Sequence, residues 1–150
     1  MGYKTHKVDW NNKQKEIMQI REKVFICEYR IPPDIEFDHK DKRCKHVLIT
    51  DEKQVIATGR ISTKGKISRI AVLQNYRNTE APSQVINTLL NIAKERGLTS
   101  VALDTELHQV STFQQQGFQT VSPVFMDSGI PKQTMACDIS CFRCPLQIVH

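Results

Sequence analysis

No apolar run in the sequence approaches the roughly 20 residues that a helix needs to cross a bilayer. The first residues, Met1 to Trp10, are polar and interrupted by charges, whereas a secretory signal carries a continuous apolar segment. The two absences argue against the common membrane-bound and secreted classes. We therefore expect a soluble, cytoplasmic protein that has no membrane partner.

Basic residues are not gathered into a run, although 21 Lys and Arg against 16 Asp and Glu give a formal net charge of +5. The sequence also has no helix-turn-helix pattern, no aromatic RNA-binding motif and no zinc-finger spacing. A dispersed excess of this size is typical of an ordinary solvated surface and favours an anionic ligand only weakly. We expect no nucleic acid among the partners.

Cysteine occurs in an odd number, five, so at least one thiol lies outside any intramolecular disulfide, which fits a reducing compartment. Cys137, Cys141 and Cys144 have a spacing similar to the iron-sulfur motif of radical enzymes, but the chain has no large barrel to carry such a cluster. Together with His150, these thiols have the composition of a Cys3His zinc site. Unliganded thiols are the alternative, and we assign no metal site.

The length of 150 residues predicts one domain with a core of two or three layers and no need for disulfide staples. No internal repeat or low-complexity linker divides the chain. We place the domain at residues 1–140 and treat residues 141–150 as a cysteine-containing tail.

The sequence is organised around a strand, a turn and a helix between Lys66 and Gly97. A β-branched, apolar segment predicts a strand over Ile67–Leu73, and polar residues 74–80 predict a turn. Apolar residues then recur at helical spacing, and Gly97 stands where a helix ends. These apolar residues are Val85, Ile86, Leu89, Leu90 and Ala93. Because the first N–H groups of a helix lack internal partners, the turn suits a phosphate-bearing ligand.

The segment before this unit predicts a first strand over Tyr3–Trp10 and a helix that begins after Asn11 or Asn12 and runs to about Tyr29. One face of that helix is apolar and is expected to be buried. It comprises Ile17, Ile20, Val24 and Cys27. Residues 31–45 are charged without a clear period and predict a loop with one short helical turn.

The remaining segments predict further strands on both sides of the central unit. A hairpin is expected at His46–Thr50 and Val55–Ser62, where Gly59 indicates a bulge or a close backbone approach. Thr99–Asp104 predicts a buried strand parallel to residues 67–73. A helix over residues 107–116 and two antiparallel strands over residues 118–126 and 133–139 complete the domain.

Val72, Tyr76 and Arg77 occupy a frame that resembles the central motif of the GNAT superfamily of N-acetyltransferases. Three further stretches resemble the ElaA-like branch of that superfamily. They are Ile20-Arg21 with Val24-Phe25, Glu28, Ile31-Pro32, Ile35-Glu36 and Asp38; Ala57-Thr58-Gly59-Arg60; and Gln116-Gly117-Phe118 with Gly129-Ile130-Pro131 and Met135. The resemblance implies an α/β (α+β) GNAT fold, a mixed and mostly antiparallel sheet of six or seven strands with helices on both faces.

The resemblance also implies an acetyl-CoA-dependent N-acetyltransferase that acts, as a monomer or homodimer, on an amine of a small molecule or protein. The amine would attack the thioester directly in a ternary complex, with the backbone N–H of Val72 as oxyanion donor. The residues implied to contact CoA are Ile70, Ala71, Val72, Arg77, Asn78, Thr79 and Ser83.

The same resemblance implies that Glu36, Asp38 and His39 meet the amine acceptor. Charges that merely solvate a surface loop are the alternative for each of these residues. Glu106 and His108 follow the fifth strand and are candidate catalytic residues that accept a proton or contact CoA. Ordinary positions at a helix start or on the surface are the alternative for both.

The glycines of the family motif are missing, because Asn78 to Pro82 stand in their place. Glu80 adds a negative charge and Pro82 removes an N–H, although such residues also compose an ordinary helix start. Phe113 stands where many relatives have a tyrosine that protonates the leaving thiolate. A catalytically impaired GNAT scaffold that serves as a binding or regulatory module is therefore the alternative function.

Overall fold

The computed structural model describes residues 2–143. Its strands are β1 (Lys4–Asp9), β2 (Lys45–Asp51), β3 (Gln54–Ile61), β4 (Lys66–Val72), β5 (Ser100–Glu106), β6 (Gln119–Thr120), β7 (Phe125–Asp127) and β8 (Ile130–Asp138). Its helices are α1 (Trp10–Arg21), α2 (Pro33–Glu36), α3 (Ala81–Glu95) and α4 (Val110–Gln115). A π-helical segment, η1 (Glu22–Glu28), continues α1. Short 3-10 turns are η2 (Asp41–Arg43), η3 (Gln74–Tyr76), η4 (Leu107–Gln109) and η5 (Ile139–Cys141).

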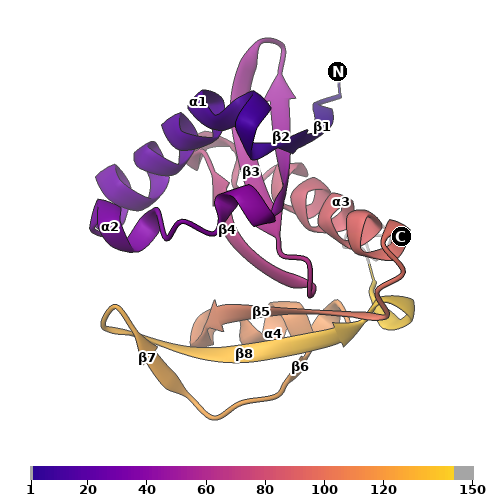
Figure 1. Cartoon of the computed structure of the whole chain (residues 1–150). Helices are drawn as coiled ribbons and strands as arrows, with labels where there is room; N and C mark the ends of the chain where they lie inside the picture. Colours follow the sequence, from indigo (N-terminus) through magenta and orange to yellow (C-terminus); the bar gives the residue numbers. More distant parts are fainter. Residues whose placement is uncertain (1, 144–150) are drawn as a thin grey trace.

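Within the described residues the strands form one eight-stranded sheet in the order β1-β2-β3-β4-β5-β8-β6, with β7 paired to β8. β4 and β5 are parallel, and the other pairs are antiparallel. Figure 1 shows β1 to β4 as one half and β5 to β8 as the other, with an opening between them. The predicted mixed, mostly antiparallel sheet is confirmed.

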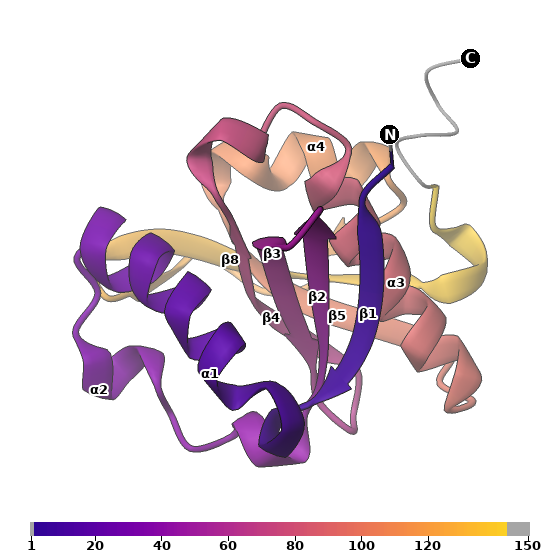
Figure 2. The ribbon, with the colours of Figure 1, turned by 90° about the horizontal axis from the view of Figure 1, so that it is seen from above.

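The helices α1 and α3 cover opposite faces of the first half of the sheet, and Figure 2 shows them on either side of its strands. Because a sheet with helices on both faces buries both, successive side chains of β2 are buried on opposite faces. Leu48 packs with Trp10 and Ile17 beneath α1, whereas Ile49 belongs to the larger core beneath α3. Leu89 of α3 is fully buried in that core. The predicted helices on both faces are therefore present.

The first helix differs from prediction at both ends. Asp9, rather than an asparagine, is the N-cap residue, and a non-helical Lys13 sets the first turn apart from the rest. Val24 is buried as expected, but Cys27 is exposed. The wide turns of η1, in which Tyr29 N–H bonds to Val24 O at 3.0 Å, break the 3.6-residue period on which the prediction rested.

Two other predicted segments are more broken than expected. The loop over residues 31–45 contains two short helical turns, α2 and η2, instead of one. The strand expected over residues 118–126 divides into β6 and β7, which accounts for the eighth strand. Pro123 lies in the interruption, where its missing N–H cannot support a ladder. The predicted end of α3 is confirmed, because Gly97 has φ 78° and Leu98 N–H bonds to Ala93 O.

Gly59 lies where the register of β3 against β4 shifts, which confirms the predicted irregularity. A Cβ at this position would be 2.7 Å from Cγ1 of Val85 and 3.1 Å from Cδ1 of Leu89. Because Val85 is short and buried, Gly59→Ala is expected to lower the free energy of unfolding by about 1–3 kcal/mol. Urea unfolding measures this loss. Gly2→Ala, made in open space, is the control, and an equally small effect of both variants contradicts the prediction.

No helix within the described residues is both long and apolar enough to cross a membrane.

Candidate active site

The opening in the sheet arises because β4 and β5 pair only where β4 begins. Lys66 lies opposite Ala102 and Ile67 opposite Leu103, and the pairing then stops. β4 stays paired with β3 on its other side as far as Val72. The second half of β4 therefore has an unpartnered edge in the described structure, although it lies in the middle of the sheet (Figure 1).

The backbone polar groups of Val72 point into this opening. Leu73 N–H donates to Ile56 O at 2.9 Å, so the adjacent pair, Val72 and Ala57, is of the non-hydrogen-bonded kind. In such a pair the N–H and C=O point away from the partner strand, here away from β3. Arg77 Nε donates to the Val72 carbonyl at 3.0 Å, which leaves the Val72 N–H directed at the opening.

The two residues before Val72 follow the same alternation. The backbone groups of Ala71 face β3, and its side chain is buried against Ile20 and Val24. The backbone groups of Ile70 face the opening, while its half-buried side chain packs against the larger core beneath α3. Of the three residues predicted to line CoA on this strand, Ile70 and Val72 therefore offer backbone groups to a ligand and Ala71 does not.

Arg69, just before these residues, has a φ of 55°, in the left-handed region that residues other than glycine rarely adopt. Its conformation costs on the order of 1 kcal/mol and must be held by contacts. Its Nε donates to Glu36 O at 3.1 Å, and its Nη2 donates to Ile35 O at 3.1 Å and to Asp38 Oδ2 at 3.2 Å. These bonds attach β4 to the loop that contains α2.

Arg77, predicted to contact phosphate, lies in the turn between β4 and α3. Its guanidinium forms a two-pronged ion pair with Glu28, both bonds at 2.6 Å, and lies 5.7 Å from the centre of the Tyr29 ring. Hydrogen bonding from Arg77 lowers the pKa of Glu28. The charge of Arg77 is thus balanced by a residue of η1, and an anion at the turn would have to share it.

The N-cap residue of α3, Glu80, makes no side-chain capping bond, but Thr79 just before it contacts the first N–H of the helix. Thr79 Oγ1 accepts the Ala81 N–H at 3.2 Å and donates to Tyr76 O at 2.6 Å. The Gln84 N–H bonds to Glu80 O at 3.0 Å. This is the ordinary helix start that the sequence left open as an alternative.

Some N–H groups at this helix start nevertheless stay open. Among the described residues no acceptor pairs with the N–H of Asn78, Glu80 or Ser83, while Pro82 has no N–H. Such groups, at the positive end of the helix dipole, favour an anion. The exposed carboxylate of Glu80 works against it. The turn has the donors for a phosphate, but fewer than a glycine-rich turn provides.

Glu36, predicted to meet an amine, is only 2% exposed. Arg21 Nε donates to its Oε2 at 2.7 Å, and Arg69 Nε lies 3.3 Å from the same atom. Burial raises the pKa of Glu36 against the pull of Arg21 and Arg69. This burial disfavours direct contact between Glu36 and an acceptor.

Asp38 and His39, the other two predicted acceptor contacts, are more accessible. Asp38 has a side chain that is 22% exposed and receives two hydrogen bonds from Arg60, at 2.7 and 3.0 Å. Although burial acts to raise it, these bonds hold the pKa of Asp38 far below its usual range. His39 is exposed and has a φ of 65°. Both remain predictions.

Asp41 completes a buried ion cluster that the sequence did not reveal. It is 4% exposed and accepts bonds from Arg21 Nη1 at 2.6 Å and from Arg60 Nη1 at 2.9 Å. Arg21 follows Ile17 and precedes Val24 at helical spacing, and Arg60 stands in a largely apolar strand, which is the signal that could have indicated buried charge. Their partners lie 20 and 19 residues away along the chain, so no local pattern identifies the pairs.

His46 lies beside this cluster, 1% exposed, with Nε2 2.9 Å from Asp41 O. Burial lowers the pKa of His46. In the unfolded chain His46 takes up a proton below about pH 6.5, whereas in the folded protein it does so only at a lower pH. Between these two points the free energy of unfolding therefore falls as the pH falls. The slope approaches about 1.4 kcal/mol per pH unit.

Urea unfolding between about pH 7.5 and 5.5 measures this His46 effect, because that interval spans the unfolded pKa. His108→Gln, which removes an exposed histidine, is expected to keep the slope, whereas His46→Gln is expected to flatten it. A wild-type profile that is flat over this interval contradicts the prediction.

The predicted catalytic pair, Glu106 and His108, lies at the end of β5. Glu106 Oε2 is 3.8 Å from His108 Nε2, and the side chains are 44% and 68% exposed. Phe113, in α4, packs edge-on against Phe118 at 5.5 Å between ring centres and has no proton to give. The structure brings Glu106 and His108 together and assigns Phe113 to the core.

The cysteine cluster is only partly described, since Cys144 and His150 lie outside residues 2–143. Cys137 is buried and Cys141 is exposed, and both are free thiols. Burial raises the pKa of the Cys137 thiol to about 11. In residues 2–143 no three His, Cys, Asp or Glu side chains are grouped so as to hold a metal ion.

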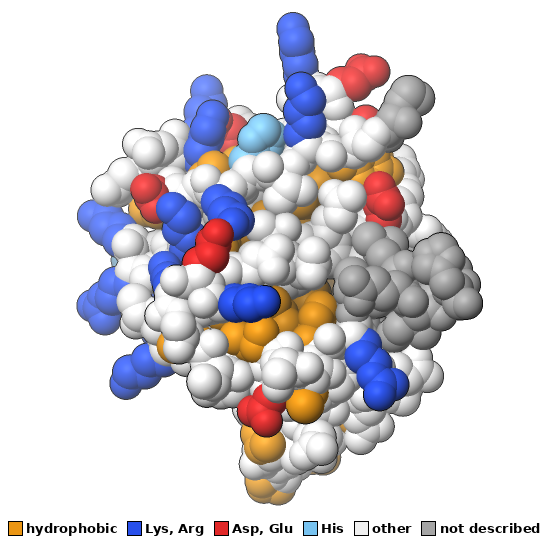
Figure 3. Space-filling view, turned by 90° about the vertical axis from the view of Figure 1, so that its right-hand side faces the viewer, with side chains coloured by type: hydrophobic (Ala, Val, Ile, Leu, Met, Phe, Trp, Pro, Cys, Tyr) orange, Lys and Arg blue, Asp and Glu red, His pale blue; other side chains and the backbone are white. Residues whose placement is uncertain are grey.

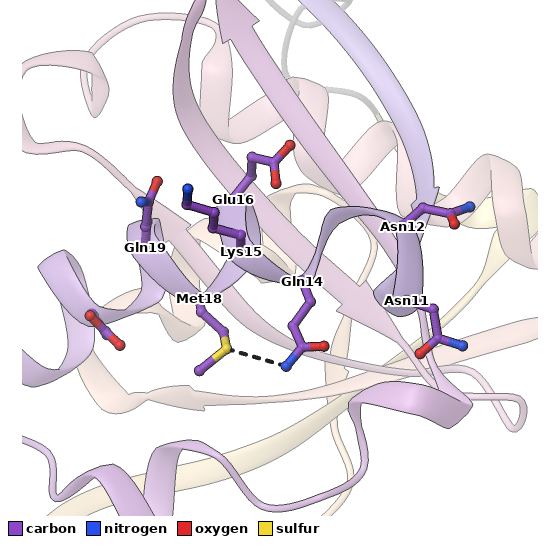
Figure 4. Close-up of a pocket in the computed structure, with 8 residues that line it drawn as sticks. Asn11, Asn12, Gln14, Lys15, Glu16, Met18 and Gln19 are labelled. Atoms are coloured by element: carbon purple, nitrogen blue, oxygen red, sulfur yellow. Dashed lines mark hydrogen bonds between the residues drawn. The ribbon is translucent and has the colours of Figure 1, made fainter.

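Two shallow depressions on the surface are separate from the opening beside β4. Figure 4 shows one on the outer side of α1, where Gln14 and Met18 are joined by a bond of 3.6 Å from Nε2 to Sδ. The other is lined by residues that include Trp10, Phe37 and His39. Neither includes a residue of β4 or of the turn before α3, so neither is the site assembled above.

Charge on the face seen in Figure 3 is mixed. Lys and Arg side chains are interspersed with Asp and Glu, and a hydrophobic patch lies near the centre. The described atoms of that face carry no continuous basic stripe of the kind that follows a nucleic-acid backbone. The absence of a nucleic-acid partner stays a prediction.

A β4–β5 pair that splays apart and leads into the start of a crossover helix agrees with the GNAT resemblance seen in the sequence. Residues 15–139 match the family model described as "Acetyltransferase (GNAT) domain". The chain therefore belongs to the GNAT acetyltransferase family. This confirms the resemblance seen in the sequence and indicates acyl transfer from an acyl-CoA to an acceptor as the general activity of the class.

Individual proteins are also similar to this chain in sequence or in fold. The chain is 36% identical over 131 residues to "Uncharacterized protein YyaT" of Bacillus subtilis (strain 168), covering 83% of this chain and 88% of the relative. Its fold matches a putative N-acetyltransferase from Lactobacillus plantarum with a TM-score of 0.85 at 21% identity, over 93% and 99% of the two chains. It matches Escherichia coli ElaA with a TM-score of 0.80 at 21% identity, over 91% and 100%. The GNAT fold and the likeness to ElaA are thus confirmed.

Proposed function

We propose that this protein transfers an acetyl group from acetyl-CoA to an amine by direct attack in a ternary complex. The observation that carries the proposal is the unpartnered edge of β4, where backbone groups of Ile70 and Val72 point into the opening beside β5. An extended thiol arm with amide groups can pair with such an edge as a missing strand would. The open N–H groups at the start of α3 then lie where the arm continues to its phosphates.

The phosphates would be held at the turn. The N–H groups of Asn78, Glu80 and Ser83 are the available donors, with the hydroxyl of Ser83 beside them. The Thr79 hydroxyl would have to give up its bond to Tyr76 O to join them. Arg77 can add a charge-assisted bond if an incoming phosphate competes with Glu28 for its guanidinium. Apart from Ala71, the predicted CoA contacts thus divide into backbone groups on β4 and polar groups at the turn.

The transfer needs the amine and the thioester carbonyl held in attack geometry. The Val72 N–H is directed into the opening and is our candidate oxyanion donor. Glu106 and His108, at the end of β5, are the candidates that take the amine proton. Since Phe113 has no proton to give, the leaving thiolate must be protonated by water or by the exposed Thr112.

The acceptor amine would enter beside the loop of residues 33–43. Asp38 and His39 are the accessible polar residues there, while Glu36 supports the loop from within. A small-molecule amine and a protein amine both remain open, because the fold positions the loop without naming its ligand. We further propose a cytoplasmic protein that is a monomer or homodimer, with residues 1–140 as its single domain.

A catalytically impaired scaffold is the second candidate function. The observation that favours it is the state of the turn, where Glu28 neutralises Arg77, Glu80 adds a negative charge and Pro82 lacks an N–H. Such a protein would bind CoA weakly and act as a binding or regulatory module.

Mass spectrometry of a reaction mixture separates the two candidates. The reduced protein is incubated with acetyl-CoA and a panel of amino acids, polyamines and lysine peptides, and products are sought at the mass of one added acetyl group. The enzyme proposal expects at least one enzyme-dependent acetylated amine, lost in Glu106→Gln/His108→Gln. Acetyl-CoA binding without any product over the panel supports the scaffold instead.

A further inference from the structure

Three arginines from three elements converge on the loop of residues 33–43. Arg21 of α1 and Arg60 of β3 are buried and hold Glu36, Asp38 and Asp41 from beneath. Each of these carboxylates accepts a hydrogen bond from at least one of the two. Arg69 of β4 contacts the same loop, but its side chain is 24% exposed.

Arg69 differs from the other two in its partners and in its backbone. Besides its pairs with the carboxylates, its guanidinium donates to two main-chain carbonyls of the loop, those of Ile35 and Glu36, whereas Arg21 donates to that of Glu36 alone and Arg60 donates only to side chains. Its own backbone is in the left-handed region, one residue before Ile70. The side chain of Arg69 therefore fixes the path of the loop. Its main chain, with a positive φ, lies at the register shift where the unpartnered edge of β4 begins.

We infer that Arg69 is a positioning residue that couples the loop of residues 33–43 to the thioester-binding edge of β4. The inference rests on the proposed function, because it concerns the same site. The Arg69 side chain fixes the position of the loop of residues 33–43 relative to the β4 backbone groups that would bind the acyl thioester. Acyl-CoA bound along β4 therefore orders the loop at a distance, through this one side chain.

The charge of Arg69 is also felt by the hairpin on the other side of the opening. Asp127 of β7 has its pKa lowered first by a hydrogen bond from Lys132 and also by the charge of Arg69. The β7–β8 hairpin thus lies within the field of Arg69, on the side of the opening opposite α2 (Figure 1).

Amide hydrogen exchange of the full chain tests the inference in Arg69→Gly. Glycine accepts a φ of 55° without strain, so this variant keeps the backbone path and removes only the side-chain bonds. Arg30→Gly is the matched control, since Arg30 also has a positive φ, of 62°, and is exposed. We expect exchange over residues 33–41 to accelerate about tenfold in Arg69→Gly and to stay unchanged in Arg30→Gly.

Adding saturating acetyl-CoA gives the readout that a purely structural role would not move. In wild type we expect protection of residues 70–83 and of residues 33–41 together. In Arg69→Gly we expect protection of residues 70–83 alone. Equal loop protection in both proteins, or unaltered loop exchange without ligand, overturns the coupling while the proposed function stands. Absence of protection anywhere in wild type overturns the proposed function and the coupling with it.

Discussion

Arg21→Met is expected to lower the free energy of unfolding by about 3–5 kcal/mol, the largest loss that a single substitution outside the apolar core should cause. Methionine keeps the length and packing of the side chain against Trp10 and Phe37, whose rings lie 5.9 and 5.0 Å from the Arg21 guanidinium carbon. It removes the charge that Glu36 and Asp41 share in the buried cluster. Chemical denaturation at neutral pH measures the loss.

An exposed ion pair provides the control for Arg21→Met. Lys7 and Glu95 lie 3.0 Å apart with side chains 39% and 64% exposed, so Lys7→Met is expected to cost less than about 1 kcal/mol. The double variant Arg21→Met/Glu36→Gln is expected to recover part of the loss. It also neutralises Glu36, so that fewer buried carboxylates lack the partner that Arg21 supplied. If Arg21→Met is as mild as Lys7→Met, the cluster is not the stabilising unit described here.

Glu80→Gly/Pro82→Gly is expected to tighten acetyl-CoA binding by about 10–100-fold. The double variant removes a carboxylate from the start of α3 and restores an N–H, and a hydrogen bond to a charged group contributes about 1.5–3 kcal/mol. Calorimetric titration of the reduced variant, with circular dichroism to verify that α3 is intact, measures the gain.

Glu22→Gln controls for net charge alone. Glu22 is exposed at the start of η1 and lies outside the turn, so its neutralisation is expected to change the affinity by less than about threefold. Affinity that is unchanged or weaker in Glu80→Gly/Pro82→Gly would show that the phosphates do not bind at the start of α3. The placement of acetyl-CoA would then be wrong.

The central strand, turn and helix could be predicted because their signals are local. β4 and α3 follow from a β-branched run and from helical spacing ended by Gly97, and the structure reproduces both. The opening beside β4 could be expected only from the resemblance. Apolar periodicity marks which residues are buried, but it does not say where two parallel strands stop pairing.

The buried ion cluster could not be predicted, because its pairs join residues far apart in sequence. Arg21 and Asp41 are 20 positions apart, and Arg60 and Asp38 are 22 positions apart. The exposed pair of Arg77 and Glu28 spans 49 positions. The sequence placed Arg77 at the phosphate site and Glu36 at the acceptor site by family position. Family position does not reveal that Glu28 forms an ion pair with Arg77. Nor does it reveal that Glu36 is buried in a hydrogen bond with Arg21.

The helix before the loop shows the same limit on a smaller scale. Helical spacing placed Cys27 on the buried face with Val24, and it failed where η1 widens the turns. A π-helical segment has no dependable signal in residue type, because its cause is the packing of its neighbours. Elements with one strong local period were foreseen, and those shaped by contacts between distant segments were not.

Calorimetric titration of the reduced wild-type protein with acetyl-CoA, and separately with CoA, tests the central claim most directly. A micromolar dissociation constant that rises in Arg77→Ala is the result expected if the β4 edge and the turn hold the cosubstrate. If no heat of binding is detected up to millimolar acetyl-CoA, the site built here does not bind its cosubstrate and the acetyltransferase function is contradicted.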